Sequence, residues 1–507
     1  MTTPPSVLGL TAGLELGLAL GFLSILNGLA GSEGGSVRRR LLSVAGLGCA
    51  LIPPALRLAT GPVAAEPWFL LLAGVLTWKA IGLDYEWTRP PRNTPVWRAL
   101  AVVFCAAGSV DALFLLPWAG IVIGRLGLWT HHAHLPLRLI FALLSLGLAD
   151  QALDFTPFGG DAADGLIATA LYLAVVLIHY WVPGLAKMAL GPRWFSWALD
   201  NTSHFFPVNA YLHGWMAFLP ARRMRWVSRT LKPLNRPLQI AVLAIEAGAP
   251  LFFFSAPTFL VWLGLVAAMQ TAIFLLTGLL FLEYIIVCLA AIFLFPGTPD
   301  PFTGLLAVLL GGVLWKARII RPCKLAWWDS PLGGKVWLEA ELDDGRRVHL
   351  PNRLLCPLER DYGQTRTLRF LDEKLPYWHL GEVASRATHA RLLAAGADPA
   401  ALGRIAAEAG RSHGEPRRRA TDLAELERIR AEDFFERKRF LPRPLRWLKF
   451  PAEHNFHWGP LPAWNPWTDR IGALELVFRE HYQTDEEIVL IRKKTILRLD
   501  GGSGGPG

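Results

Sequence analysis

The chain has 507 residues, of which 52% are hydrophobic and only 18% are charged, whereas soluble globular domains carry roughly 25% charged residues. This composition excludes an ordinary soluble enzyme. The excess of apolar residues lies almost entirely before residue 321, and the last third of the chain is more charged. We therefore expect an all-α polytopic membrane bundle, residues 1–320, followed by a small soluble α+β domain, residues 321–500.

The net charge of +10 comes from basic residues that cluster between the apolar segments, at Arg38–Arg40, Arg89 to Arg98 and Arg222 to Arg236. Such clusters are typical of loops held at the anionic cytoplasmic face of a membrane. The expected partner is therefore the lipid bilayer of the inner or cell membrane, and not nucleic acid. The five cysteines are scattered without CxxC spacing, so we predict neither a disulfide framework nor a zinc knuckle.

About ten membrane-spanning helices are predicted, since each apolar segment approaches the roughly 20 residues that cross a bilayer. The first is a retained span and not a signal peptide, because no basic segment precedes it and Glu15 interrupts it. The segment 99–128 is either one tilted helix or a pair of helices divided near Asp111 and Pro117, and we favour the pair. The predicted spans are 7–30, 41–62, 67–84, 99–128, 135–153, 165–190, 238–256, 257–275, 276–296 and 302–320.

The membrane topology follows from the number of spans. Four predicted spans separate the basic segment Arg222 to Arg236 from the domain after Pro322. An even number of crossings returns the chain to the side from which it started, so the basic segment and the domain should share one side. We expect this side to be cytoplasmic, because clustered basic residues are costly to translocate.

The C-terminal domain should begin with a β-hairpin. Residues 335–342 and 346–351 alternate apolar and polar side chains on the two sides of Asp343-Asp344-Gly345, which is a turn sequence. One face of the hairpin, which we expect to pack against protein, would carry Val336, Leu338, Ala340 and Leu342. Helices are predicted over 382–411 and 421–440, irregular chain over 440–467, one or two closing strands within 488–499, and a flexible tail over 501–507.

Three histidines lie close together at His131, His132 and His134. Their spacing suggests a metal site, but the additional ligands that such a site needs, such as an HExxH motif, are absent from the sequence. We therefore predict no metal and interpret the cluster as lying at the membrane interface, at the start of a helix.

A second polar feature surrounds Lys187, which ends an apolar segment. Pro183 and Gly184 loosen the helix one turn earlier, and the rings of Tyr180 and Trp181 could enclose a planar ligand. Desolvation favours the neutral form of a lysine, which can act as a general base. The alternative is a lysine that extends from the helix end to the lipid headgroups.

Two motifs in this region occur in a specific order. W-x-x-H-x-x-L runs from Trp129 through His132 to Leu135, and Y-x-x-x-G-x-x-K-x-x-x-x-x-x-W runs from Tyr180 through Lys187 to Trp194. Weaker similarities occur at Asp150, Glu246, Phe274, Gly278, Tyr284 and Trp328-Asp329. Over roughly residues 65–355, the sequence resembles the vitamin K-dependent γ-glutamyl carboxylases and their broader relatives, the bacterial horizontally transferred transmembrane (HTTM) proteins.

The resemblance implies an enzyme that oxidises vitamin K hydroquinone, or a menaquinol-type quinol, with dioxygen to the epoxide. The strong base formed on the way removes a γ-proton from a glutamate of a peptide or protein, which then captures carbon dioxide. In that scheme Lys187 deprotonates the hydroquinone and His132 stabilises a neighbouring charged species. The cofactor-binding residues implied are Tyr180, Trp181, Trp129 and Glu246.

The sequence also departs from the carboxylases. They carry a phenylalanine-histidine pair where this chain has Val266 and Ala267, and the residues after 320 leave no room for the propeptide-binding part of the animal enzymes. One alternative is therefore a non-catalytic HTTM-type membrane factor for the maturation or binding of secreted peptides or lipids. Another is a lipid-linked sugar transferase that uses Asp84 and Glu86. The carboxylase-type enzyme requires His132 and Lys187 to face one intramembrane cavity.

Overall fold

The computed structural model describes residues 5–30, 67–82, 94–126, 128, 134–154, 164–212, 221–278, 281–294, 299–349, 370–375, 381–414 and 471–500. Several predicted features lie outside these residues. They are the span 41–62, Asp84 and Glu86, the motif residues Trp129 and His132, the segments 421–440 and 440–467, and the tail 501–507.

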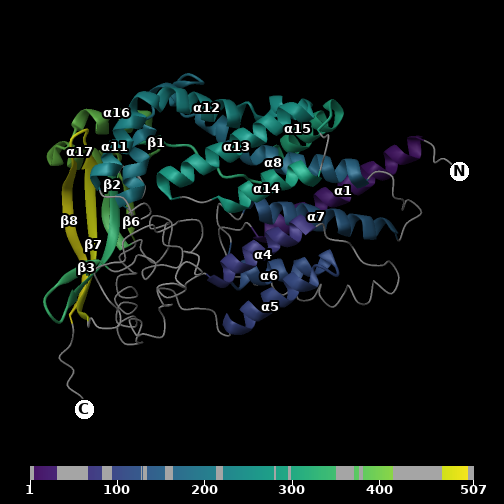
Figure 1. The fold of residues 1–507 in the computed structure, drawn as a ribbon, viewed down its shortest axis with the longest axis horizontal. Helices are drawn as coiled ribbons and strands as arrows, with labels where there is room; N and C mark the ends of the chain where they lie inside the picture. Colours follow the sequence, from purple (N-terminus) through teal and green to yellow (C-terminus); the bar gives the residue numbers. More distant parts are fainter. Residues whose placement is uncertain are drawn as a thin grey trace, which may run out of the picture.

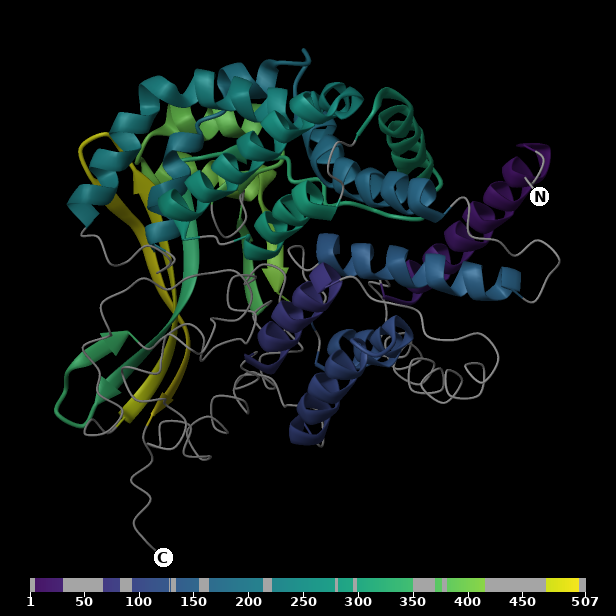
Figure 2. The ribbon, with the colours of Figure 1, turned by 45° about the vertical axis from the view of Figure 1, so that its right-hand side comes forward.

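The first part of the chain folds into a bundle of apolar helices, with the C-terminal sheet at the end opposite the N-terminus (Figures 1 and 2). Most of the predicted spans coincide with a helix, but the span 238–256 is divided at Gly248 between a shorter helix and a 3-10 segment. The helices are α1 (Pro5–Ala30), α4 (Pro67–Gly82), α5 (Thr94–Ala107), α6 (Leu115–Gly124), α7 (His134–Asp154), α8 (Asp164–Met188), α12 (Asn235–Ala247), α13 (Ala256–Thr277), α14 (Leu282–Leu294) and α15 (Pro301–Lys316).

The segment 99–128 forms two helices, as favoured from the sequence. Between α5 and α6 the chain makes a turn and the short 3-10 helix η1 (Ala112–Phe114). Asp111 caps η1, because its carboxylate accepts a hydrogen bond of 2.9 Å from the backbone N–H of Leu113. A Cβ at Gly108 would lie 2.8 Å from Leu115 Cδ2, so a larger residue there would require the Leu115 side chain to move.

Two helices, α8 and α13, are long and apolar enough to cross a membrane, and the other apolar helices in the described part of the chain are shorter or less apolar. The two differ in burial, since α8 lies mostly inside the bundle whereas α13 is mostly exposed. Large apolar side chains are exposed along several helices: Leu14, Leu18 and Ile25 of α1, Val96, Val102 and Val103 of α5, Leu260, Val261, Leu265 and Leu275 of α13, and Phe302, Leu305, Leu309 and Val313 of α15.

Short helices connect α8 to α12, and further short elements flank α12. They are α9 (Ser196–Asp200), η2 (Ser203–Phe205), α10 (Phe206–Leu212), α11 (Ala221–Leu231), η3 (Lys232–Leu234) and η4 (Ala249–Phe254). The basic segment contacts the C-terminal domain. Lys232 Nζ lies 2.6 Å from an Asp485 carboxylate oxygen, and Gln483 Nε2 donates a hydrogen bond of 2.6 Å to Ser228 Oγ. The basic segment and the C-terminal domain therefore lie together; that both lie on one side of a membrane stays a prediction.

The core of the C-terminal domain is an antiparallel four-stranded sheet of order β3-β2-β7-β8. Its strands are β2 (Leu332–Leu342), β3 (Arg347–His349), β7 (Ile471–Gln483) and β8 (Ile488–Asp500). Two strand pairs and two helices complete the described part: β1 (Trp328–Asp329) with β5 (Glu382–Val383), β4 (Phe370–Leu375) with β6 (Arg411–Gly414), and α16 (Arg386–Ala395) and α17 (Pro399–Ala409).

The predicted hairpin is confirmed. Strands β2 and β3 pair with Glu341 opposite Arg347, and Gly345 adopts the left-handed φ of 80° that the turn requires. Ala340 and Leu342 share one face and are both buried, as expected; the side chains of Val336 and Leu338 lie outside those that the structure describes.

Other predictions for this domain need correction. The predicted helix 382–411 is two helices, because the chain turns at Gly396, which has a φ of 58°, and Asp398 caps the second helix. The closing residues form one strand, β8, and its long partner β7 was missed. Leu474 and Phe478 alternate with Glu475 and Arg479 in β7, so period-two alternation was the available signal.

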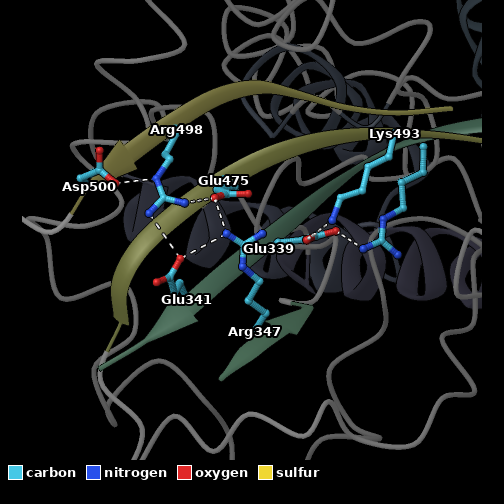
Figure 3. A network of polar contacts seen from close by, with 8 residues as sticks. Glu339, Glu341, Arg347, Glu475, Lys493, Arg498 and Asp500 are labelled. Carbon is cyan, nitrogen blue, oxygen red and sulfur yellow. Dashed lines mark hydrogen bonds and ion pairs between the residues drawn. The ribbon is translucent and has the colours of Figure 1, made fainter. Parts of the chain in front are cut away.

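One face of the four-stranded sheet carries charged residues (Figure 3). Glu339 and Glu475 lie opposite each other on β2 and β7 and are each only 4% exposed. Each acid is paired with two basic side chains: Glu339 with Arg479 and Lys493, and Glu475 with Arg347 and Arg498. The pairing compensates the desolvation of the two buried carboxylates.

The domain is joined to the bundle through the carboxylate of Asp329, which is 5% exposed. Asn201 Nδ2 and Ser203 Oγ donate to one carboxylate oxygen at 2.8 and 2.7 Å, and Trp327 Nε1 donates to the other at 2.9 Å. The segments that follow α8 and α15 are therefore held together at the start of the domain.

Two histidines near this junction are held neutral. Burial, followed by the charge of Lys232, lowers the pKa of His204 to about 4. Burial, followed by Arg479, lowers the pKa of His481 to about 4. In an unfolded chain both would titrate near 6.5.

Acidification is therefore expected to destabilise the junction. Below about pH 6.5 the unfolded chain binds protons that the folded chain does not, so stability falls until about pH 4 and then levels off, by roughly 1 kcal/mol per pH unit for each histidine. Thermal unfolding of the detergent-solubilised protein across this range measures the loss. His204→Gln should reduce the slope. A stability that stays constant or rises as the pH falls through this window would contradict the assignment.

Candidate functional site

Lys187 forms a buried ion pair with Glu246. Lys187 Nζ, in the last turn of α8, lies 2.6 Å from Glu246 Oε2 on α12, and each residue is only 8% exposed. Glu246, which the resemblance assigns to the cofactor site, is thus the counter-charge of the lysine. The lysine is directed into the bundle, which does not fit a side chain that extends to the lipid headgroups.

A close approach of two helix backbones positions this pair. A Cβ at Gly184 would lie 2.3 Å from the backbone nitrogen of Ala247, so only glycine allows α8 and α12 to come this close. Pro183, which lies inside α8, has no N–H to donate to the helix. One turn after Gly184 the lysine meets Glu246, the residue before Ala247.

Substitution of Gly184 is expected to separate the two helices. Gly184→Ala should cost about 1–3 kcal/mol, because the new methyl group must displace the backbone at Ala247. The matched control is Gly264→Ala on α13, where a Cβ meets no atom within 4 Å and alanine should be neutral or stabilising. Thermal unfolding of the two variants in detergent compares them. Equal stability of the two would show that the close approach is not required.

Trp197 completes the surroundings of the lysine. Lys187 Nζ lies 5.5 Å from the centre of the Trp197 ring, a cation–π contact. Trp197 Nε1 in turn donates a hydrogen bond of 2.8 Å to the carbonyl of Trp327. Sequence reasoning missed Trp197, since no motif or periodicity distinguishes it. The motif residue Trp194 is 77% exposed.

The two aromatic residues predicted to bind a cofactor face different helices. Tyr180 lies about two helical turns before Lys187, on the same side of α8, and its ring meets Trp262 edge to face at 5.2 Å and Tyr284 at 6.1 Å. Trp181 instead packs against Trp315 of α15, at 6.2 Å. The structure thus brings Tyr180, but not Trp181, to the side of the ion pair.

Trp262 connects the tyrosine to the helix that carries Glu246. Its Nε1 donates a hydrogen bond of 2.9 Å to the carbonyl of Ile245. Val266 lies on α13, the helix that carries Trp262, and is buried. It is one of the positions at which the sequence departs from the carboxylases. Gln270 of α13 is 6% exposed, and its Oε1 accepts no hydrogen bond from the described residues.

Arg138 and His179 form a second polar contact inside the bundle. Arg138 Nη1 lies 3.0 Å from His179 Nε2, and Arg138 Nη2 donates to the carbonyl of Arg321 at 2.7 Å. The other ring nitrogen of His179 lies 2.6 Å from the carbonyl of Val175. A carbonyl can only accept, so Nδ1 carries the proton and Nε2 accepts from the arginine. The contact joins α7, α8 and the chain after α15.

A further buried ion pair joins Lys79 of α4 to Glu283 of α14, with side chains only 3% and 1% exposed. It has no glycine-mediated backbone contact in the described residues and no motif surrounds it. It therefore provides a structural reference for the pair at Lys187.

The remaining predicted site residues are Trp129 and His132, which lie outside the described residues, so the partnership of His132 with Lys187 stays a prediction. Among the described residues no group of three histidine, cysteine, aspartate or glutamate side chains is arranged to hold a metal ion. Comparison with protein-family models, curated proteins and solved structures finds no match for this chain. The resemblance to the carboxylase and HTTM proteins thus rests on the sequence motifs alone.

Proposed function

We propose that the chain is a multi-pass integral membrane protein whose helical bundle lies in the lipid bilayer. The support is the apolar surface of the bundle: Val261 of α13 and Leu309 of α15 are each 59% exposed, and Phe302 is 64% exposed. Apolar surface repeated along several helices would be unfavourable in water and is normal against lipid. In this arrangement the C-terminal domain lies on the same side as the basic segment, which is the cytoplasmic side.

Within the membrane, the protein acts as a quinol-oxidising enzyme of the γ-glutamyl carboxylase type. The observation that carries this proposal is the buried pair of Lys187 and Glu246. In a medium of low polarity, such a pair can transfer its shared proton from Nζ to the carboxylate without changing the net charge. The resulting amine is a general base that can accept the proton of a phenolic hydroxyl.

The surroundings of the pair fit a quinol. The rings of Tyr180, Trp262 and Tyr284 offer an aromatic environment, and Gln270 Oε1 is a buried acceptor without a partner among the described residues. The quinol, once oxidised by dioxygen, would supply the strong base for carboxylation of a peptide glutamate with carbon dioxide. The chain itself would accept the hydroxyl proton at Lys187 and exclude water from the site.

The second candidate is a non-catalytic membrane factor for the maturation or binding of secreted peptides or lipids. The observation that favours it is the mutual neutralisation of Lys187 and Glu246, which is also what a purely structural pair requires. Val266 and Ala267, in place of the phenylalanine-histidine pair, point in the same direction.

Two measurements on the purified protein separate the candidates. Lipids extracted from it are searched by mass spectrometry for a prenylated naphthoquinone, and the protein in lipid nanodiscs is assayed for oxygen-dependent consumption of vitamin K hydroquinone. The enzyme predicts both bound quinone and turnover to the epoxide. The absence of turnover in a folded, membrane-inserted preparation would favour the non-catalytic factor.

A further inference from the structure

Helix α11 has one buried face and one exposed face. Met224 and Ser228 are each only 1% exposed. Ser228 Oγ donates a hydrogen bond of 2.6 Å to the carbonyl of His204 and accepts one from Gln483 of strand β7. The buried face of α11 is thus fixed to the junction and to the C-terminal sheet, which holds the helix in one orientation.

The opposite face combines basic residues with an aromatic ring. It consists of Arg222, Arg223, Trp226 and Arg229, which we call the basic-aromatic face; Trp226 is 62% exposed, and at 100° per residue it lies between the arginines. None of the three arginines forms an ion pair with a described residue. A large exposed indole is unfavourable in water, and an indole between arginines that pair with no described carboxylate matches the interface of a membrane, where tryptophan and arginine are both stabilised.

The neighbouring elements present apolar side chains as well. Leu234 of η3 and Leu238 of α12 are each 46% exposed, and Phe195, which follows α8, is 51% exposed. Because α12 continues from η3 to Glu246 inside the bundle, these residues lie close to where the chain enters the apolar layer. The exposed residues therefore change from basic to apolar along the chain from α11 into the bundle.

We infer that the basic-aromatic face of α11 binds the headgroups of anionic phospholipids and thereby fixes the C-terminal domain against the membrane surface. The charge is complementary, since each arginine near such a surface adds attraction that salt weakens. The inference rests on the part of the proposed function that places the bundle in a bilayer, and is independent of the reaction.

The test uses the full chain in nanodiscs of phosphatidylcholine, with or without phosphatidylglycerol. In a variant whose native cysteines are replaced by alanine, a fluorophore is attached at Trp226→Cys, at Val261→Cys on the exposed side of α13, or at Arg404→Cys on α17. Lipids with a nitroxide near the headgroup or deep in the acyl chain then quench each label. For the wild-type chain, hydrogen exchange of residues 221–231 in both nanodiscs gives a second measurement without substitutions.

We expect the label at 226 to be quenched by the headgroup nitroxide in anionic nanodiscs, and the label at 404 to be quenched much less. The triple variant Arg222→Gln/Arg223→Gln/Arg229→Gln should lower the equilibrium constant for contact between the basic-aromatic face and anionic headgroups roughly a hundredfold. In the wild-type chain, hydrogen exchange of α11 should slow only with anionic lipid. Equal quenching at 226 and 404, or exchange that ignores lipid charge, would overturn the inference.

The label at 261 distinguishes this failure from failure of the membrane proposal. If the acyl-chain nitroxide quenches the label at 261 and the headgroup nitroxide does not quench the label at 226, only the role of α11 is refuted. If the label at 261 is not quenched, the membrane placement is refuted as well. The lipid-free protein is also tested for binding of RNA. If it binds RNA and the triple substitution abolishes this binding, the basic-aromatic face belongs to nucleic acid, and the inference is overturned.

Discussion

Replacing Lys187 by arginine is expected to abolish quinol turnover while the protein remains folded and membrane-inserted. A guanidinium preserves the positive charge and can still pair with Glu246, but it does not lose a proton in proteins and so cannot act as a base. Lys187→Ala, which removes both charge and base, should abolish turnover too. A general base commonly contributes about 10²–10⁴-fold in rate, and turnover of vitamin K hydroquinone in nanodiscs measures the loss.

The matched control is Lys79→Arg, which makes the same substitution in the other buried lysine–glutamate pair. It should retain turnover, because Lys79 contacts Glu283 and not the proposed site. His132→Ala should strongly impair turnover if the motif-based role holds. Full activity of Lys187→Arg would show that the lysine acts only through its charge, and the non-catalytic interpretation would then be preferred.

Replacing Lys79 by methionine is expected to cause the largest loss of stability among these changes. The substitution leaves Glu283, which is only 1% exposed, without its cation. Removal of one partner from a buried pair typically costs about 3–5 kcal/mol. The free energy of unfolding, obtained from denaturation in mixed detergent, measures the cost, and turnover per folded molecule should change little.

The double variant Lys79→Met/Glu283→Leu provides the control. With both charges replaced by apolar groups of similar size, most of the lost stability should return, because no unpaired charge is left in the bundle. If the double variant is as unstable as Lys79→Met alone, the cost arises from packing and not from the unpaired carboxylate.

The sequence alone located the elements of this protein. Apolar segments near the length that crosses a bilayer predicted the bounds of helices such as α7, α8 and α13 to within a few residues. Asp111 and Pro117 favoured a pair of helices over one tilted helix within 99–128, because a charge and a proline interrupt an apolar helix. Asp343-Asp344-Gly345, between alternating strands, predicted the hairpin. These features are local, so the physical preferences of neighbouring residues determine them.

The sequence also named Lys187 and Glu246, from the cost of charge in an apolar segment and from the ordered motifs. It could not determine which side chains surround them. Trp197 beneath the lysine, Trp262 between Tyr180 and α12, and the separate direction of Trp181 all follow from how α8 is rotated in the bundle. Since α8 is apolar on most faces, hydrophobic periodicity does not specify that rotation.

Only the tertiary structure decided the contacts between distant parts of the chain. The pairing of Lys187 with a residue 59 positions away depends on the close approach at Gly184, which a single glycine in a helical segment does not reveal. In the sheet, Glu339 and Glu475 are buried because β7 lies between β2 and β8 and brings basic side chains over them. Such contacts depend on how whole elements pack, because each element alone could satisfy its own backbone and hydrophobic pattern in several arrangements.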